Sequence, residues 1–86
     1  MNNKYLINEF GKRVRELRLD MELSQEKLSF ITGFHRTYIG MIERGERNIS
    51  LANLAVFSKA FGMSLSKLLD NNAINSVEKY ETKVQE

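Results

Sequence analysis

The chain has 86 residues, of which 13 are basic and 11 acidic, and its formal net charge is +2. This length predicts one domain with a modest core. Without cysteine and with a single histidine, the chain excludes disulfides and metal sites of thiolate or clustered histidine, so we predict no metal and no cofactor. No apolar run approaches the roughly 20 residues that span a bilayer. No signal peptide opens the chain, and we therefore expect a cytoplasmic protein without a membrane partner.

The first predicted element is an amphipathic helix over residues 5–19, whose apolar positions recur at helical spacing. These positions are Leu6, Phe10, Val14 and Leu17. Basic residues crowd its polar side: Lys12, Arg13, Arg15 and Arg18. Two interpretations of these charges remain open, namely a solvated surface or one or two contacts to phosphate.

Residues 24–47 predict two short helices joined by a tight turn and followed by a basic loop. Ser24 is a favourable N-cap, and Gly33 ends the first helix because glycine enters the left-handed region at little cost. The inward positions are expected to be Leu28, Ile31 and Thr32 in the first helix, and Ile39 and Ile42 in the second. This is the spacing of a helix-turn-helix, although a plain helical hairpin shares part of it.

Two further helices are predicted, the fourth after a Ser50 cap and the fifth over residues 65–69 after a Ser64 cap. The core face of the fourth is expected to comprise Leu54, Phe57, Ser58 and Phe61. Other apolar residues exceed what so small a core needs, and they predict either core closure or a partner surface. These residues are Val56, Met63, Leu65 and Leu69. We place the domain at residues 1–70, and residues 71–86 form a polar tail.

In that tail, Ile74, Val77, Tyr80 and Val84 follow helical spacing, which favours a short sixth helix over a disordered segment.

Residues 10–69 resemble the Xre/Cro family of phage-repressor-like DNA-binding domains. The resemblance rests on Leu23-Ser24-Gln25-Glu26, Gly33, Ile39, Ile42-Glu43-Arg44-Gly45 and the stretch 54–69. The runs 35–39 and 42–48 resemble, more narrowly, the controller proteins of restriction–modification systems. The resemblance implies an all-α, five-helix domain with a helix-turn-helix, a structural ion pair between Arg18 and Glu43, and a homodimer interface in the apolar residues named above.

The second helix of the motif, over residues 36–44, is expected to enter the DNA major groove. Arg36 can donate two bonds to guanine, and the Thr37 methyl suits thymine. Tyr38 either packs along the sugar-phosphate wall or is half-buried scaffold. Glu46 repels phosphate and is expected to point away from DNA. The predicted DNA-binding residues are Gln25, Arg36, Thr37, Tyr38, Met41, Arg44, Arg47 and Asn48.

The resemblance assigns Gln25 to a phosphate and Arg47 to the DNA, with Arg44 and Asn48 as weaker candidates. Met41 stands where related repressors carry a base-contacting residue, but a thioether offers little polar readout.

We predict no catalytic residues, because there is one histidine, no cysteine, and no glycine pattern of a nucleotide site. The predicted function is that of a homodimeric regulator that binds a pseudo-palindromic operator in double-stranded DNA. The resemblance further implies a controller that regulates its own operon and a restriction endonuclease gene, with RNA polymerase as a second candidate partner. A prophage-type repressor, an antitoxin and a protein-interaction module remain as alternatives.

Overall fold

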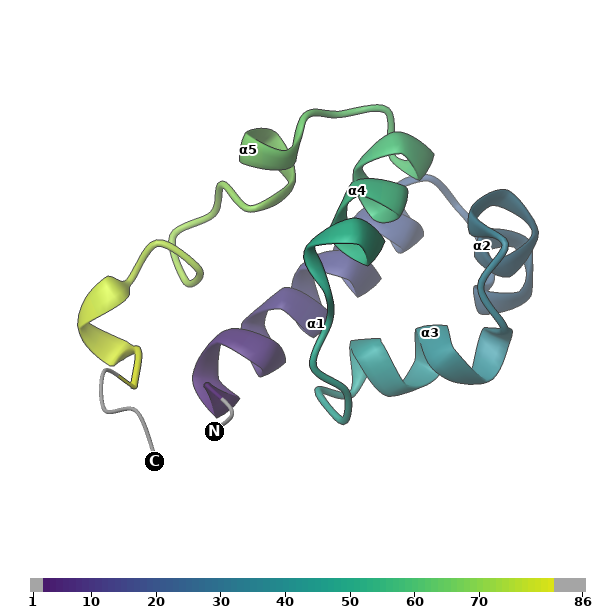
Figure 1. The fold of residues 1–86 in the computed structure, drawn as a ribbon. Coiled ribbons are helices and arrows are strands. Elements are labelled where there is room, and N and C mark those ends of the chain that lie inside the picture. Colours follow the sequence, from purple (N-terminus) through teal and green to yellow (C-terminus); the bar gives the residue numbers. More distant parts are fainter. Residues whose placement is uncertain (1–2, 82–86) are drawn as a thin grey trace.

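The computed structural model describes residues 3–81, which form five α-helices and one 3₁₀ turn and contain no β-strand. Figure 1 shows α4 crossing α1, the α2–α3 pair to one side, and the C-terminal segment returning toward the N-terminus. The predicted all-α, five-helix architecture is confirmed. The elements are α1 (Lys4–Asp20), α2 (Gln25–Thr32), α3 (Arg36–Glu43), α4 (Leu51–Ala60), α5 (Leu65–Leu68) and η1 (Val77–Lys79).

Serine side chains begin three of the helices, as the sequence predicts. The hydroxyls of Ser24, Ser50 and Ser64 accept bonds of 3.0, 3.1 and 3.1 Å from backbone amides three residues later. Each bond satisfies an amide that has no partner inside its helix. Gly33 ends α2 with a φ of 80°, in the left-handed region that glycine adopts without a Cβ clash.

The core gathers apolar residues from every helix around Phe57 of α4, which is fully buried. The Phe57 ring lies 6.2 Å from Phe10 and 5.3 Å from Phe34, between centroids. The buried apolar set is Phe10, Val14, Leu28, Ile39, Ile42, Phe57, Phe61, Leu68 and Ile74. Ile39 and Ile42 are therefore the inward pair of α3, as predicted.

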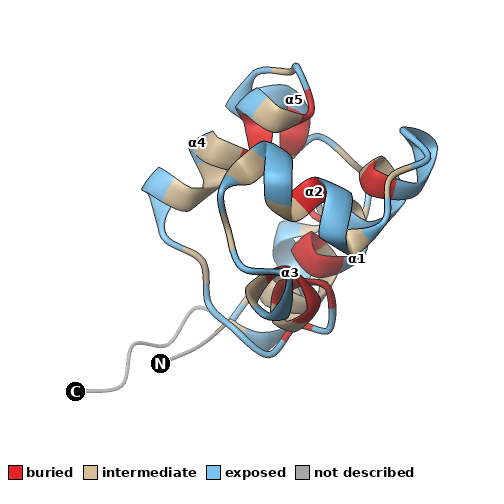
Figure 2. Cartoon of the chain, turned by 90° about the vertical axis from the view of Figure 1, so that its right-hand side faces the viewer, coloured by how far each residue is buried: buried red, intermediate tan, exposed pale blue. Residues whose placement is uncertain are grey.

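Ile31 does not belong to the inward face of α2, where the sequence placed it. Its side chain is 51% exposed, while Leu28 is fully buried. The helix has only eight residues, and it uses a narrow side along Leu28 and Thr32, which lie one turn apart. Figure 2, which looks onto the α2–α3 side, shows much of the outer surface of α2 as exposed.

Helices α1 and α3 come into close contact at Gly11. A Cβ on Gly11 would lie 2.8 Å from the carbonyl oxygen of Glu43 and closer still to that of Ile42. Only a residue without a side chain fits between the two helices at this separation. Gly11 therefore sets how deeply α3 lies against the rest of the domain.

Residues 71–81 pack on the start of α1, and only a single 3₁₀ turn forms there. Ile74 is buried, and the Tyr5 hydroxyl donates a 2.7 Å bond to the carbonyl of Ala73. The predicted sixth helix is thus wrong for the described residues. Side chains bond to nearby backbone groups instead: the side-chain oxygen of Asn71 accepts a 2.7 Å hydrogen bond from the backbone amide of Ile74. Val84 lies outside the described residues.

Arg13 holds the short α5 in place. Its Nε and Nη2 donate bonds of 2.8 and 2.9 Å to the carbonyls of Leu68 and Lys67 at the end of this helix, where carbonyls lack the full set of intrahelical partners. The structure thus gives this cation a role within the fold that neither interpretation of the α1 charges foresaw.

Candidate nucleic-acid interface

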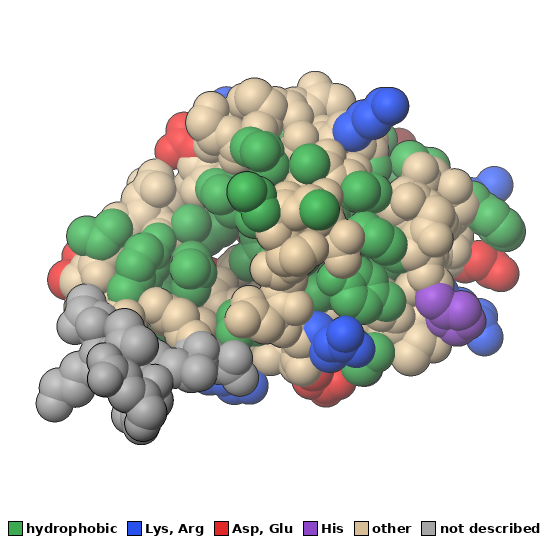
Figure 3. All heavy atoms as spheres, viewed as in Figure 1, with side chains coloured by type: hydrophobic (Ala, Val, Ile, Leu, Met, Phe, Trp, Pro, Cys, Tyr) green, Lys and Arg blue, Asp and Glu red, His purple; other side chains and the backbone are tan. Residues whose placement is uncertain are grey.

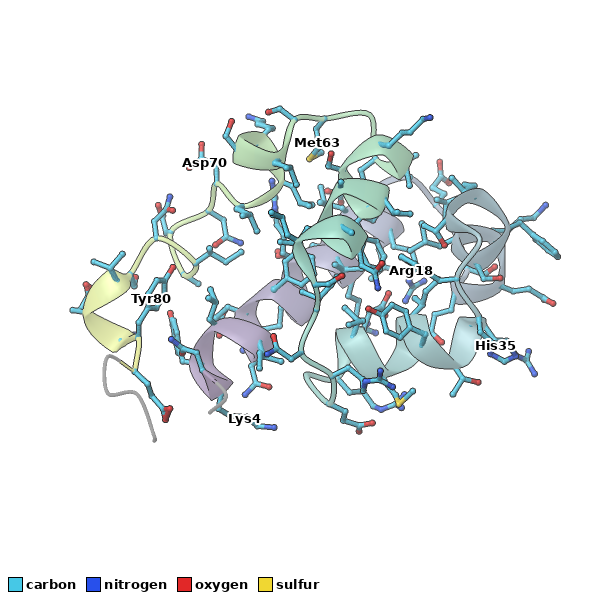
Figure 4. All side chains as sticks on the ribbon, in the orientation of Figure 1. Lys4, Arg18, His35, Met63, Asp70 and Tyr80 are labelled. Carbon is cyan, nitrogen blue, oxygen red and sulfur yellow. The ribbon has the colours of Figure 1, made fainter. Side chains whose placement is uncertain are left out.

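The first turn of α3 presents exposed polar side chains beside a well-capped helix start. Arg36 and Thr37 are both exposed, and the Nδ1 of His35 accepts a 3.0 Å bond from the Thr37 amide. Figure 4 shows His35 at the outer edge of the molecule. Because Ile39 and Ile42 hold α3 in the core, the exposed Arg36 and Thr37 project into solvent from a rigid element.

Glu43 joins α1, α2 and α3 through buried and part-buried hydrogen bonds. It accepts from Arg18 at 2.7 Å (Nε to Oε2) and 3.0 Å (Nη2 to Oε1), and from Nε2 of Gln25 at 3.2 Å. The hydrogen bond to Glu43 raises the pKa of Arg18, although burial of the guanidinium opposes this. Figure 4 shows Arg18 between these helices. The ion pair implied by the resemblance is therefore present.

The same network orients Gln25 on the outer side of the α2–α3 unit. A side-chain amide nitrogen carries two hydrogens, so the bond to Glu43 leaves one N–H to donate elsewhere. The amide is held rather than freely rotating, which lowers the entropy lost on contact with a phosphate.

Tyr38 is half-buried and joins the first turn of α3 to α4. Its hydroxyl accepts a 2.9 Å bond from Asn53, and its ring lies 4.9 Å from that of Phe34. Because the hydroxyl acts as an acceptor here, its own hydrogen can be donated to a phosphate. The scaffold and phosphate interpretations of Tyr38 are therefore compatible. The guanidinium carbon of Arg47 lies 5.5 Å above the ring, a cation–π contact that limits where Arg47 points.

Arg44 and Glu46 form an exposed ion pair that the sequence analysis missed. Nε and Nη2 of Arg44 donate to the two carboxylate oxygens of Glu46 at 2.9 and 3.1 Å. This hydrogen bonding lowers the pKa of Glu46 and raises that of Arg44. Glu46 thus pairs with a predicted DNA-binding residue. The residues are two apart in a loop, where no helical or strand periodicity indicates a contact.

The guanidinium of Arg44 lies against Gly40, which is buried. A Cβ on Gly40 would stand 3.0 Å from Nη1 of Arg44 and 3.6 Å from Oε1 of Gln25. Gln25 and Arg44 therefore lie near each other, and both cover Gly40. Lys4 was also missed: its Nζ donates a 3.2 Å bond to the Gly45 carbonyl, so the start of α1 borders the loop after α3.

The remaining predicted positions are distributed unevenly. Met41 is half-buried and Asn48 is exposed. Of the apolar patch, Leu65 is 36% exposed, whereas Val56, Met63 and Leu69 are half-buried. Leu69 also lines an apolar groove of about 520 Å³ between α1, α4 and the C-terminal segment. Hydrophobic side chains gather over α4, α5 and this segment on the face seen in Figure 3.

Within residues 3–81 no group of histidine, cysteine and acidic side chains is arranged to hold a metal ion. The same residues contain no helix with the length and apolarity needed to cross a membrane.

The two short helices, the left-handed glycine turn between them and the exposed first turn of α3 define a helix-turn-helix. A sequence model of the family described as Helix-turn-helix matches residues 14–68. The chain belongs to this Xre-type family of DNA-binding transcriptional regulators.

Among known relatives, the chain is similar to Control protein C.BamHI of Bacillus amyloliquefaciens. The two are 50% identical over 70 residues, which covers 80% of this chain and 86% of that protein. It is also similar in structure to the restriction–modification controller protein C.AhdI from Aeromonas hydrophila, with a TM-score of 0.67, 44% identity, and coverage of 73% of this chain and 94% of that one.

A third similarity is to the controller C.Esp1396I, solved as a tetramer with its natural 35 base-pair operator. The TM-score is 0.70 at 28% identity, over 74% of this chain and 84% of that one.

Proposed function

We propose that this protein is a sequence-specific regulator that binds an operator in double-stranded DNA as a homodimer. The observation that carries the proposal is the outer side of α3, where Arg36 and Thr37 stand exposed on a helix fixed by Ile39 and Ile42. An α-helix fits the major groove, and side chains of its first turn reach base edges there.

Base readout and phosphate contact fall to different residues. Arg36 donates two bonds to a guanine, and Thr37 packs its methyl on a thymine. Gln25 and Tyr38, each with a hydrogen left to donate, bind phosphates and fix the register. Arg47, in the loop after α3, contacts the sugar-phosphate backbone of the DNA. Met41, which is half-buried, and Asn48, which is exposed, contribute apolar and polar contacts respectively.

Replacing Arg36 by alanine is expected to weaken operator binding by about 1–3 kcal/mol and to relax preference at one base pair. The reason is that a bidentate arginine discriminates guanine from the other bases. Fluorescence anisotropy at fixed salt, on operator duplexes varied one position at a time, measures both effects. Lys59→Ala, which removes an exposed cation from α4, is the matched control. If Arg36→Ala weakened binding to operator and to random duplex equally, Arg36 would contact phosphate and not a base.

The homodimer is proposed to form through the apolar patch of Val56, Met63, Leu65 and Leu69. Two copies related by a two-fold axis would place their α3 helices in successive major grooves, about 10 bp apart on one face of the duplex. Continuity of the patch with the apolar groove beside Leu69 supports this location. In this arrangement residues 3–70 supply the DNA-reading and pairing surfaces, and residues 71–81 brace the start of α1.

Leu65→Asp is expected to shift the protein from dimer to monomer. Leu65 is 36% exposed in the monomer, so a charge there should destabilise the dimer, which would bury it, more than the folded monomer. Sedimentation velocity measures the mass, and a thermal melt checks that the variant is folded. Ile31→Asp is the control: it places the same charge at an exposed aliphatic residue of α2, away from the proposed interface. This variant is expected to remain dimeric. If Leu65→Asp is folded and keeps the wild-type sedimentation mass, the dimer interface does not lie at this patch.

The proposed biological role is that of a restriction–modification controller, which regulates its own operon and the endonuclease gene and acts on RNA polymerase. Support comes from the 50% identity with Control protein C.BamHI over most of both chains. A promoter fusion to a reporter, with the regulator supplied at graded levels, tests the role. Activation at low levels that turns to repression at high levels is the expected result.

A further inference from the structure

We propose that Glu46 is a specificity-determining residue, which withholds Arg44 from random DNA and releases it to a phosphate of the operator. The inference rests on the proposed function, because it concerns the same DNA-binding surface. It adds a role for an acidic residue at a place where negative charge would be expected only to hinder binding.

The geometry gives Arg44 two competing environments. Its Nε and Nη2 are taken up by the two oxygens of Glu46, at 2.9 and 3.1 Å. These two donors form one edge of the planar guanidinium fork, which binds a phosphate or a carboxylate through two parallel bonds. The third nitrogen, Nη1, lies over Gly40 beside Gln25. The Arg44 guanidinium therefore lies beside α3 and Gln25, and the Glu46 carboxylate balances its charge.

The pair is exposed enough to exchange partners. The side chains of Arg44 and Glu46 are 57% and 50% exposed, in contrast to the 9% and 3% of Arg18 and Glu43. Exposed ion pairs contribute little to stability because water and salt screen them. A phosphate held in the correct place by the rest of the interface can thus replace the Glu46 carboxylate as the partner of Arg44.

Random DNA does not offer that exchange. Non-specific complexes rest on loosely placed phosphate contacts, so no phosphate is held in register with Arg44, and Glu46 remains its partner. Arg47 differs from Arg44, because its guanidinium lies over the Tyr38 ring, a contact that leaves its charge for DNA in both kinds of complex. The operator therefore gains one cationic contact that random sequence lacks.

Glu46→Gln is expected to bring Arg44 into contact with random DNA. On a random duplex, the slope of log K against log salt should steepen by about 0.9, which is the release of counterions from one more phosphate. On the operator the slope should stay unchanged, because Arg44 already binds phosphate there, and affinity should rise less than about fivefold. The ratio of operator to random affinity should consequently fall.

A double-mutant cycle separates this exchange from simple repulsion between Glu46 and DNA. In an Arg44→Ala background, the additional Glu46→Gln change should leave the random-duplex slope unaltered, because no guanidinium is freed. Glu9→Gln is the matched control: it removes the partner of Lys12, 3.3 Å away on α1, and should leave DNA binding unchanged. Titrations on both duplexes at four or more salt concentrations supply the slopes.

The outcomes are distinguishable. The proposal is supported if Glu46→Gln steepens the random-duplex slope when Arg44 is present and does not steepen it in the Arg44→Ala background. Equal steepening with and without Arg44, or no steepening, overturns it and leaves Glu46 as a repelling charge or a bystander. If the wild type prefers no sequence at all, the proposed function fails. The random-duplex slopes still report in that case whether Glu46 masks Arg44.

Discussion

Glu43→Ala is expected to lower the free energy of unfolding by about 3–5 kcal/mol, because it strands the buried guanidinium of Arg18 without its partner. The carboxylate accepts two bonds from Arg18 and one from Gln25, and both ends of the pair are buried. For a domain of this size the loss corresponds to a fall in Tm of more than about 12 °C, measured by thermal or urea unfolding. This is the largest effect expected from any substitution considered.

Two further variants show what the pair contributes. Glu46→Ala removes an exposed carboxylate from the neighbouring loop and should leave Tm nearly unchanged. The double variant Arg18→Met with Glu43→Leu replaces the pair by apolar side chains, and should recover most of the stability lost in Glu43→Ala. It should nevertheless bind operator more weakly than wild type, because Gln25 loses its anchor. A Glu43→Ala protein as stable as wild type would contradict the structural role.

Gly11→Ala is expected to destabilise the domain by about 3 kcal/mol relative to a matched glycine substitution in α3. The new Cβ would meet the backbone carbonyls of Ile42 and Glu43, and backbone cannot rotate away as a side chain can. The substitution must therefore push α1 and α3 apart. Since α3 carries Arg36 and Thr37, operator affinity should fall with stability. Urea unfolding measures the first effect and anisotropy the second.

Gly40→Ala is the matched control, because it also replaces a glycine within a helix and gains about 1 kcal/mol of helix propensity. Its Cβ would stand 3.0 Å from Nη1 of Arg44, the far end of a flexible side chain that can move. Stability should be unchanged or higher. If both alanines were equally tolerated, the close contact of α1 and α3 at Gly11 would be wrong.

Local chemistry explains why much of this fold follows from the sequence. A serine before an apolar helix indicates an N-cap, and Ser24, Ser50 and Ser64 each form one. The turn glycine Gly33 adopts positive φ as predicted. Such features act within three or four residues, so the sequence displays both partners. The ion pair of Arg18 with Glu43, 25 residues apart, became predictable only through resemblance to a family.

Features that depend on packing at short helices or on loop geometry were not predictable. Ile31 follows helical spacing, but α2 is too short to bury a wide face. Residues 71–81 have the spacing of a helix, yet Asn71 binds the backbone locally and Ile74 anchors an irregular segment. Contacts of Glu46 with Arg44 and of Lys4 with Gly45 arise in or against a loop, where no periodicity relates the partners.

The most direct test of the central claim is selection of binding sites from a random duplex library, read by sequencing at about 0.15 M salt, since affinity for DNA is steeply salt-dependent. A dimer that reads bases through α3 should enrich a two-fold symmetric motif with half-sites about 10 bp apart. A guanine contacted by Arg36 should recur in each half. A library that emerges without an enriched motif would contradict sequence-specific binding, and a lone asymmetric half-site would contradict the dimer.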